Sequence, residues 1–139
     1  DSDGAVELAV FGNASANIAA RVPIHNLGSI KEPETMAKVY SAGDLIVVPS
    51  RIESFGQTAS EALSCGTPVA CFDTSGLRDI ARNQDCGIRA KAFDVSDLAH
   101  SIRQLLKKDF DPTSVAQQAK IFDLGQIVEQ TLVFYGTRR

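Results

Sequence analysis

The sequence predicts an α/β protein built on a doubly wound parallel sheet. Short apolar runs typical of strands alternate along the chain with segments whose apolar residues recur at helical spacing. The 139 residues are 44% hydrophobic and contain no internal repeat or low-complexity stretch. A chain of this size can bury a core of its own, and we therefore expect a single domain over residues 1–139.

The elements follow one another in strand and helix order. Strands are predicted over the short apolar runs at residues 6–11, 23–27, 44–48, 69–72 and 87–90. Helices are predicted over residues 14–21, 77–82, 95–108, 112–122 and 124–135. Two more are predicted, one from Pro33 through Tyr40 and one that follows the strand at 44–48 and ends at Gly66. Asp94 or Ser96 is expected to cap the helix at 95–108.

Two glutamates, Glu53 and Glu61, stand on either side of one predicted strand-to-helix turn. The apolar run at 44–48 ends at Pro49, and the helix that follows ends at Gly66. The glutamates therefore fall at the carboxyl end of a strand and within the next helix, where open α/β sheets bind their ligands. This placement predicts a binding site.

The backbone between these glutamates is suited to a phosphate. The amides from Phe55 to Thr58 open the helix and have no partner within it, and a helix N-terminus carries partial positive charge. Gly56 lets the backbone approach a ligand closely. Ionised carboxylates on both sides could accept strong hydrogen bonds from sugar hydroxyls. The implied ligand is a nucleotide diphospho-sugar.

The segment Glu-Ser-Phe-Gly-Gln-Thr-Ala-Ser-Glu-Ala-Leu-Ser-Cys-Gly-Thr-Pro-Val, which starts at Glu53, resembles the signature of family four retaining glycosyltransferases. The likeness extends to Gly28, to Ala-Gly-Asp at 42–44, to Pro-Ser at 49–50 and to Ser-Gly-Leu-Arg-Asp at 75–79. It implies the Rossmann-like, donor-binding, C-terminal half of an enzyme with the GT-B fold.

The resemblance also implies a role for each site residue. Glu53 would make the catalytic contact with the donor hexose near the reacting carbon, and Glu61 would bind the ribose hydroxyls. The base would meet the backbone of Ser29 and Ile30. The donor sugar and diphosphate would lie against the backbone amides of Phe55, Gly56, Gln57 and Thr58.

The implied parent enzyme transfers a hexose from a UDP- or GDP-sugar to an acceptor hydroxyl with retention of configuration. We expect no metal and no cofactor, because amides and basic residues can stabilise the leaving diphosphate. The acceptor would be a glycan or a lipid-linked molecule, as in polysaccharide biosynthesis. Compared with the family pattern, the chain is expected to lack the first strand-helix unit, with its arginine and lysine, and the N-terminal acceptor domain, and to be inactive alone.

Simpler interpretations exist for the motif. Thr58 and Glu61 have the spacing of a capping box, and so do Ser54 and Gln57, so these pairs could merely stabilise the start of a helix. Two other function classes stay open. One is a nucleotide-sugar 2-epimerase, although no cluster of ionisable residues suits that chemistry. The other is a non-catalytic nucleotide-binding or regulatory domain.

Composition and sequence pattern limit the classes of ligand and the cellular location expected for the chain. A net charge of −3 without a basic run argues against nucleic-acid binding. With no signal-peptide pattern and no run of about eighteen apolar residues, we expect a cytoplasmic protein. The resemblance adds the cytoplasmic face of a membrane and a peripheral membrane association of the parent.

The remaining reactive side chains are expected to be structural or solvated. The cysteines, Cys65, Cys71 and Cys86, are odd in number and lack metal-site spacing, which favours reduced core thiols. His25 and His100 are interpreted as structural or solvated, and Arg51 as a solvated loop residue. Arg78 could reach a phosphate or pair with Asp79.

Overall fold

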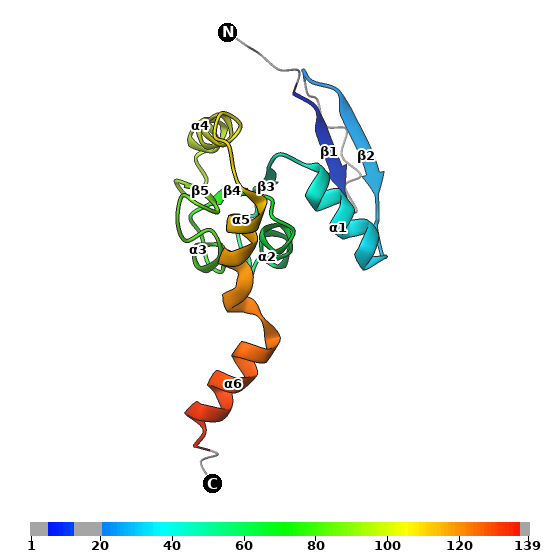
Figure 1. Ribbon diagram of the computed structural model, residues 1–139. Helices are drawn as coiled ribbons and strands as arrows, with labels where there is room; N and C mark the ends of the chain where they lie inside the picture. The colour runs from blue at the N-terminus through cyan, green and yellow to red at the C-terminus, as the bar shows by residue number, and fades with distance from the viewer. Residues whose placement is uncertain (1–5, 13–20, 137–139) are drawn as a thin grey trace. The chain divides into compact units, whose positions relative to one another are not determined.

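The computed structural model describes residues 6–12 and 21–136 (Figure 1). The helix predicted over 14–21 lies outside the described residues except for Arg21. The chain divides into two compact units, Asp1–Met36 and Ala37–Arg139. The single domain expected over residues 1–139 stays a prediction.

The described part of the first unit contains a parallel pair of strands. Strand β1 (Leu8–Phe11) pairs with β2 (Ile24–Gly28), and the register shifts by one residue near the end of β1. Helix α1 (Pro33–Ala42) starts in this unit and ends in the second. Both strands and this helix lie where the sequence predicts them, with bounds that differ by one or two residues.

The second unit contains a parallel three-stranded sheet in the order β3-β4-β5. The strands are β3 (Ile46–Val48), β4 (Val69–Phe72) and β5 (Gly87–Ala90). Parallel neighbours need a crossover connection, which α2 (Gln57–Ser64) supplies after β3 and the short α3 (Leu77–Ile80) supplies after β4. Helix α4 (Val95–Leu105) follows β5.

The C-terminal part of the chain is helical. It consists of α5 (Pro112–Ala119), a 3₁₀ turn η1 (Lys120–Phe122) and α6 (Leu124–Phe134). Each α-helix from α4 onward has an aspartate as its N-cap, and the aspartate side chain accepts a hydrogen bond from a backbone amide of the first turn. These caps are Asp94, Asp111 and Asp123. The cap of α4 is thus Asp94 and not Ser96.

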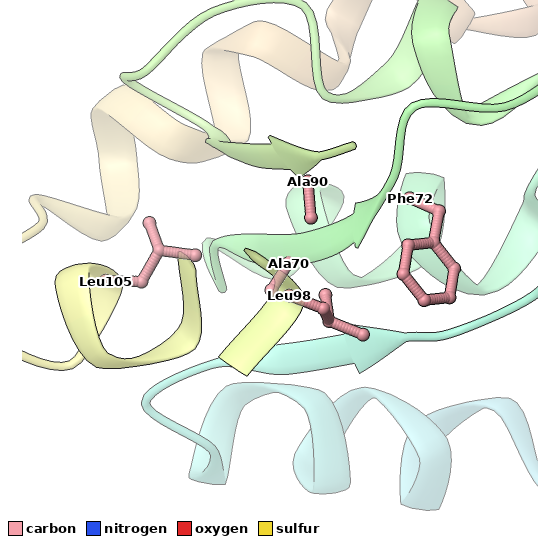
Figure 2. Packing of buried hydrophobic residues seen from close by; sticks show 5 residues of the cluster. All are labelled: Ala70, Phe72, Ala90, Leu98 and Leu105. Atoms are coloured by element: carbon pink, nitrogen blue, oxygen red, sulfur yellow. The ribbon is translucent and has the colours of Figure 1, made fainter. Parts of the chain in front are cut away.

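The core of the second unit lies on both faces of β4, whose residues are all buried. Figure 2 shows Ala70 and Phe72 of β4 in one cluster with Leu98 and Leu105 of α4. Successive strand residues point to opposite faces, so Val69 and Cys71 face away from this cluster, and both are fully buried. On that face α2 contacts β3 and β4. Helices therefore cover both faces of the sheet, as in a doubly wound fold.

All three cysteines are free thiols, as the sequence predicts. Cys71 and Cys86 are buried in the core, whereas Cys65 is half-buried. Burial raises the pKa of the Cys71 thiol to about 12. The Cys71 thiol is therefore protonated and unreactive at neutral pH.

Candidate functional site

The loop that carries Glu53 is anchored by the loop that follows the neighbouring strand. The Glu53 amide donates to Ser75 Oγ at 3.0 Å, and the Glu53 carbonyl accepts from the Gly76 amide at 3.1 Å. Because β3 and β4 are parallel, both loops leave the same edge of the sheet. The Glu53 backbone is therefore fixed at the carboxyl edge, where the sequence places it.

Two glycines let these loops come together. Gly56 has φ +89°, and a Cβ there would lie 2.9 Å from Leu77 Cδ2. A Cβ on Gly76 would lie 2.7 Å from the Phe55 carbonyl oxygen. A side chain at either position would clash where the two loops meet, and the left-handed backbone of Gly56 favours glycine as well.

Helix α2 starts at this turn without a side-chain cap. Its N-cap is Gly56, and no side chain among the described residues accepts a hydrogen bond at the cap. The interpretation of Ser54 or Thr58 as a capping-box residue is therefore wrong, because Gly56 holds the cap position with a left-handed backbone. The first amides of α2 are left for water or for an anion.

Glu61 is held by one donor on each carboxylate oxygen. Tyr40 Oη donates to Oε2 at 2.9 Å, and Gln57 Nε2 donates to Oε1 at 2.9 Å. In a capping box the glutamate side chain would instead accept from the backbone N–H of the N-cap residue. The Glu61 carboxylate thus has a defined place beside the start of α2.

Tyr40 is the site residue that the sequence did not reveal. It lies in α1 and is 2% exposed. Burial, and next the hydrogen bond to Glu61, raise the pKa of Tyr40 well above its usual value. The only signal in the sequence was its position on the apolar face of a predicted helix, which is equally typical of a core tyrosine.

The turn predicted to meet a base lies in the first unit. Gly28 ends β2 with φ +66°, and its amide donates to Asn26 Oδ1 at 3.0 Å. Ser29 follows as an exposed residue and Ile30 as a half-buried one. Since the glutamates belong to the second unit, the role of Ser29 and Ile30 stays a prediction.

The cations near the site have protein partners. Arg78 donates to Asp73 Oδ1 at 3.1 Å, so its partner is not Asp79, the adjacent residue. Neighbours along a helix point in different directions, which prevents the expected pair. Arg51 is exposed and lies 5.5 Å from the centre of the Phe93 ring.

The two histidines lie on the protein surface. His25 Nε2 lies 2.7 Å from Glu7 Oε2, with both side chains exposed, and His100 is exposed on α4. No group of three or more potential metal-ligating side chains lies together within the described part of the chain. In the same part, no helix has the length and apolar character needed to cross a membrane.

Comparison with known proteins identifies the family. The family model described as glycosyl transferases group 1 matches residues 11–122, a range that includes the whole corner from Glu53 to Glu61. The chain therefore belongs to the group 1 glycosyl transferases.

Two curated relatives share one name. D-inositol 3-phosphate glycosyltransferase of Rhodococcus erythropolis is 41% identical over 63% of this chain and 19% of that protein. The Rhodococcus opacus protein of that name is 35% identical over 84% of this chain and 25% of its own length. The chain thus spans roughly a fifth to a quarter of these relatives.

A solved structure supports the fold. Sucrose-phosphate synthase from Thermosynechococcus elongatus superposes with a TM-score of 0.61 and 29% sequence identity, over 82% of this chain and 31% of that one. Together with the family match, this confirms the prediction of a Rossmann-like α/β domain of the GT-B type.

Proposed function

We propose that the corner at the start of α2 binds a nucleotide diphospho-sugar, and that the chain is the donor-binding domain of a family four glycosyltransferase. One observation carries this proposal: the uncapped first turn of α2, entered through Gly56 at φ +89°, lies between Glu53 and Glu61. Anion-binding amides and two hydroxyl-binding carboxylates then occur on one short stretch of chain.

Each part of the donor has a proposed partner. The diphosphate and donor sugar bind the amides from Phe55 to Thr58, while Glu53 accepts hydrogen bonds from the hexose hydroxyls. Glu61 accepts those of the ribose. The backbone of Ser29 and Ile30 meets the base of a UDP- or GDP-sugar.

The chemistry is transfer of the sugar to an acceptor hydroxyl with retention at the anomeric carbon. Negative charge grows on the diphosphate as the glycosidic bond breaks, and amides fixed at a helix N-terminus stabilise that charge without having to reorganise. Glu53 is fixed through its backbone on both sides, so its carboxylate can hold the hexose in one orientation during the transfer. We propose that neither metal nor cofactor takes part.

The wider setting is also a proposal. The acceptor is a glycan or a lipid-linked molecule, and the enzyme works in the cytoplasm or at the cytoplasmic face of a membrane. D-inositol 3-phosphate, which the relatives' names contain, is not carried over to this chain, because the chain spans only roughly a fifth to a quarter of those proteins. Neither an epimerase nor a regulatory domain is favoured by a family match to glycosyl transferases.

The ribose contact is tested by replacing Glu61. We expect Glu61→Ala to weaken binding of UDP, GDP or ADP, whichever binds best, by at least about tenfold, because hydrogen bonds to a charged group contribute about 1.5–3 kcal/mol each. Isothermal titration calorimetry on the chain gives the Kd values. Glu129→Ala, on the exposed surface of α6, is the control. Unchanged affinity in Glu61→Ala would contradict the ribose role.

A further inference from the structure

We propose that Tyr40 is a positioning residue for donor binding, which acts by holding the Glu61 carboxylate in the orientation that accepts the two ribose hydroxyls. This inference rests on the proposed function of Glu61. The Tyr40 phenol itself does not touch the donor in this proposal. Its effect on binding passes through one hydrogen bond, from Tyr40 Oη to Glu61 Oε2 at 2.9 Å.

The arrangement of donors around Glu61 suits a vicinal diol. A carboxylate has about four acceptor sites, and Tyr40 and Gln57 each occupy one, on different oxygens. One further site is thereby left on each oxygen. A diol presents two O–H donors side by side, so it can fill both remaining sites at once.

Glu61 needs such anchoring because its side chain is otherwise free to move. A long side chain at the protein surface samples several rotamers, and fixing them costs free energy when a ligand binds. Gln57 alone is a weak anchor, since it is exposed and lies one turn earlier on the same helix. Tyr40 instead belongs to α1, so it ties the carboxylate to a different element.

Tyr40 is itself fixed by the core. Its side chain is buried, and its carbonyl accepts from Thr67 Oγ1 at 2.7 Å and from the Gly43 amide at 3.2 Å. The phenol that donates to the Glu61 carboxylate is therefore held in one position by its surroundings.

The test pairs a mutation with a change in the ligand. The Kd values of UDP, GDP and ADP and of their 2′,3′-dideoxy counterparts are measured on the chain and on Tyr40→Phe. We expect Tyr40→Phe to weaken the ribonucleotide that binds best by about two- to tenfold, the range typical of one hydrogen bond. With the dideoxy ligand the weakening should shrink to less than about twofold. Equal weakening of both ligands, or none of either, would overturn the inference.

A second readout needs no ligand. In the free chain, loss of the Tyr40 hydroxyl should move the NMR signal of the Gln57 side-chain amide, because the carboxylate that it binds loses its other anchor. An unmoved signal would contradict the positioning role. Tyr135→Phe is the matched control, since Tyr135 is exposed, and it should change neither readout. The backbone NMR spectrum of each variant verifies the fold.

The outcomes separate this inference from the proposed function. If the chain binds no nucleotide, or if Glu61→Ala keeps full affinity, the ribose role of Glu61 fails and the inference fails with it. If Glu61→Ala loses affinity and Tyr40→Phe does not, only the role of Tyr40 fails. In the double variant, Tyr40→Phe should add less than about twofold to the loss from Glu61→Ala.

Discussion

At the scale of single residues, Gly56 determines whether the turn before α2 can form. Its left-handed backbone costs other residues about 1–2 kcal/mol, and a Cβ would meet Leu77 and Ile80 at 2.9 and 3.0 Å. Overpacking adds about 1–3 kcal/mol. We therefore predict that Gly56→Ala lowers the free energy of unfolding by about 2–5 kcal/mol in urea denaturation.

Gly43→Ala is the matched control for that substitution. A Cβ at Gly43 would have no neighbour closer than 3.6 Å, and Gly43 is not among the glycines with positive φ. The free energy of unfolding of Gly43→Ala should differ from that of the unaltered chain by less than about 1 kcal/mol. Equal losses in the two variants would show that the turn at Gly56 has no special demand for glycine.

Glu53 allows a prediction that separates the sugar from the nucleotide. If its carboxylate holds the hexose, Glu53→Gln should leave the Kd of the nucleoside diphosphate unchanged and weaken that of the matching nucleotide sugar about three- to tenfold. Calorimetry on both ligands measures this difference. The backbone anchors of Glu53 to Ser75 and Gly76 do not involve its side chain, so the loop should keep its shape. Equal affinity changes for both ligands would contradict the hexose contact.

The roles of individual side chains were only partly predictable from the sequence. Glu53 and Glu61 were singled out because motif and topology agreed on the same corner. The capping-box pattern of Thr58 and Glu61 misled, because it assumed a side-chain cap where Gly56 forms the cap through its backbone. Tyr40 was missed because its partner Glu61 is distant in sequence, and only the folded chain brings the two side chains together.

At the scale of elements, the anchoring of one loop by another is the feature that shapes the site. A Cβ on Gly76 would meet the Phe55 backbone oxygen at 2.7 Å, and backbone atoms cannot move aside as a flexible side chain can. We predict that Gly76→Ala shifts the amide NMR signals of residues 53–58 and weakens nucleotide binding at least about threefold. Gly43→Ala again serves as the control. Unshifted signals at 53–58 would show that the two loops are not coupled.

The boundaries of two strands were predictable from the sequence. The strands Val69–Phe72 and Gly87–Ala90 have the predicted bounds. The first is a fully buried apolar run, whereas the second contains the exposed Arg89 and is limited by turn residues on both sides. Helix ends without glycine or proline were less predictable. Helix α4 ends at Leu105 instead of Lys108, and the helix predicted over 112–122 turns into a 3₁₀ turn after Ala119.

At the scale of the whole molecule, buried acidic groups predict sensitivity to alkaline pH. The Cys71 thiol has an ordinary pKa of 9.0 and a folded pKa of about 12. The unfolded chain therefore loses this proton near pH 9 and the folded chain does not, so stability is intact below pH 9 and falls between pH 9 and about 12. Tyr40, whose pKa is also raised, adds to the decline above about pH 10.

Thermal unfolding between pH 7 and 11 measures this effect. We expect Tm to fall above pH 9, and to fall less steeply in Cys71→Ala, although that variant starts from a lower Tm because of the cavity. Burial also raises the pKa of the half-buried Cys65 thiol, so Cys65→Ala should flatten the profile as well, but less than Cys71→Ala does. Parallel pH profiles for Cys71→Ala and the unaltered chain would contradict the prediction.

The family and the fold are properties of the chain as a whole. The chain belongs to the group 1 glycosyl transferases, yet donor, acceptor and stereochemistry are properties of the whole enzyme. The predicted base contact at Ser29 and Ile30 lies in the first unit, and the corner from Glu53 to Glu61 lies in the second. A ligand titration can test each of these regions by itself.

The most direct measurement is an NMR titration of the chain with UDP, GDP and ADP. We expect one of these nucleotides to shift the amide signals of Phe55, Gly56, Gln57 and Thr58, and also those of Ser29 and Ile30, which would identify the base. If none of the three nucleotides shifts the amides from Phe55 to Thr58, the start of α2 is not a donor site and the proposed function is wrong.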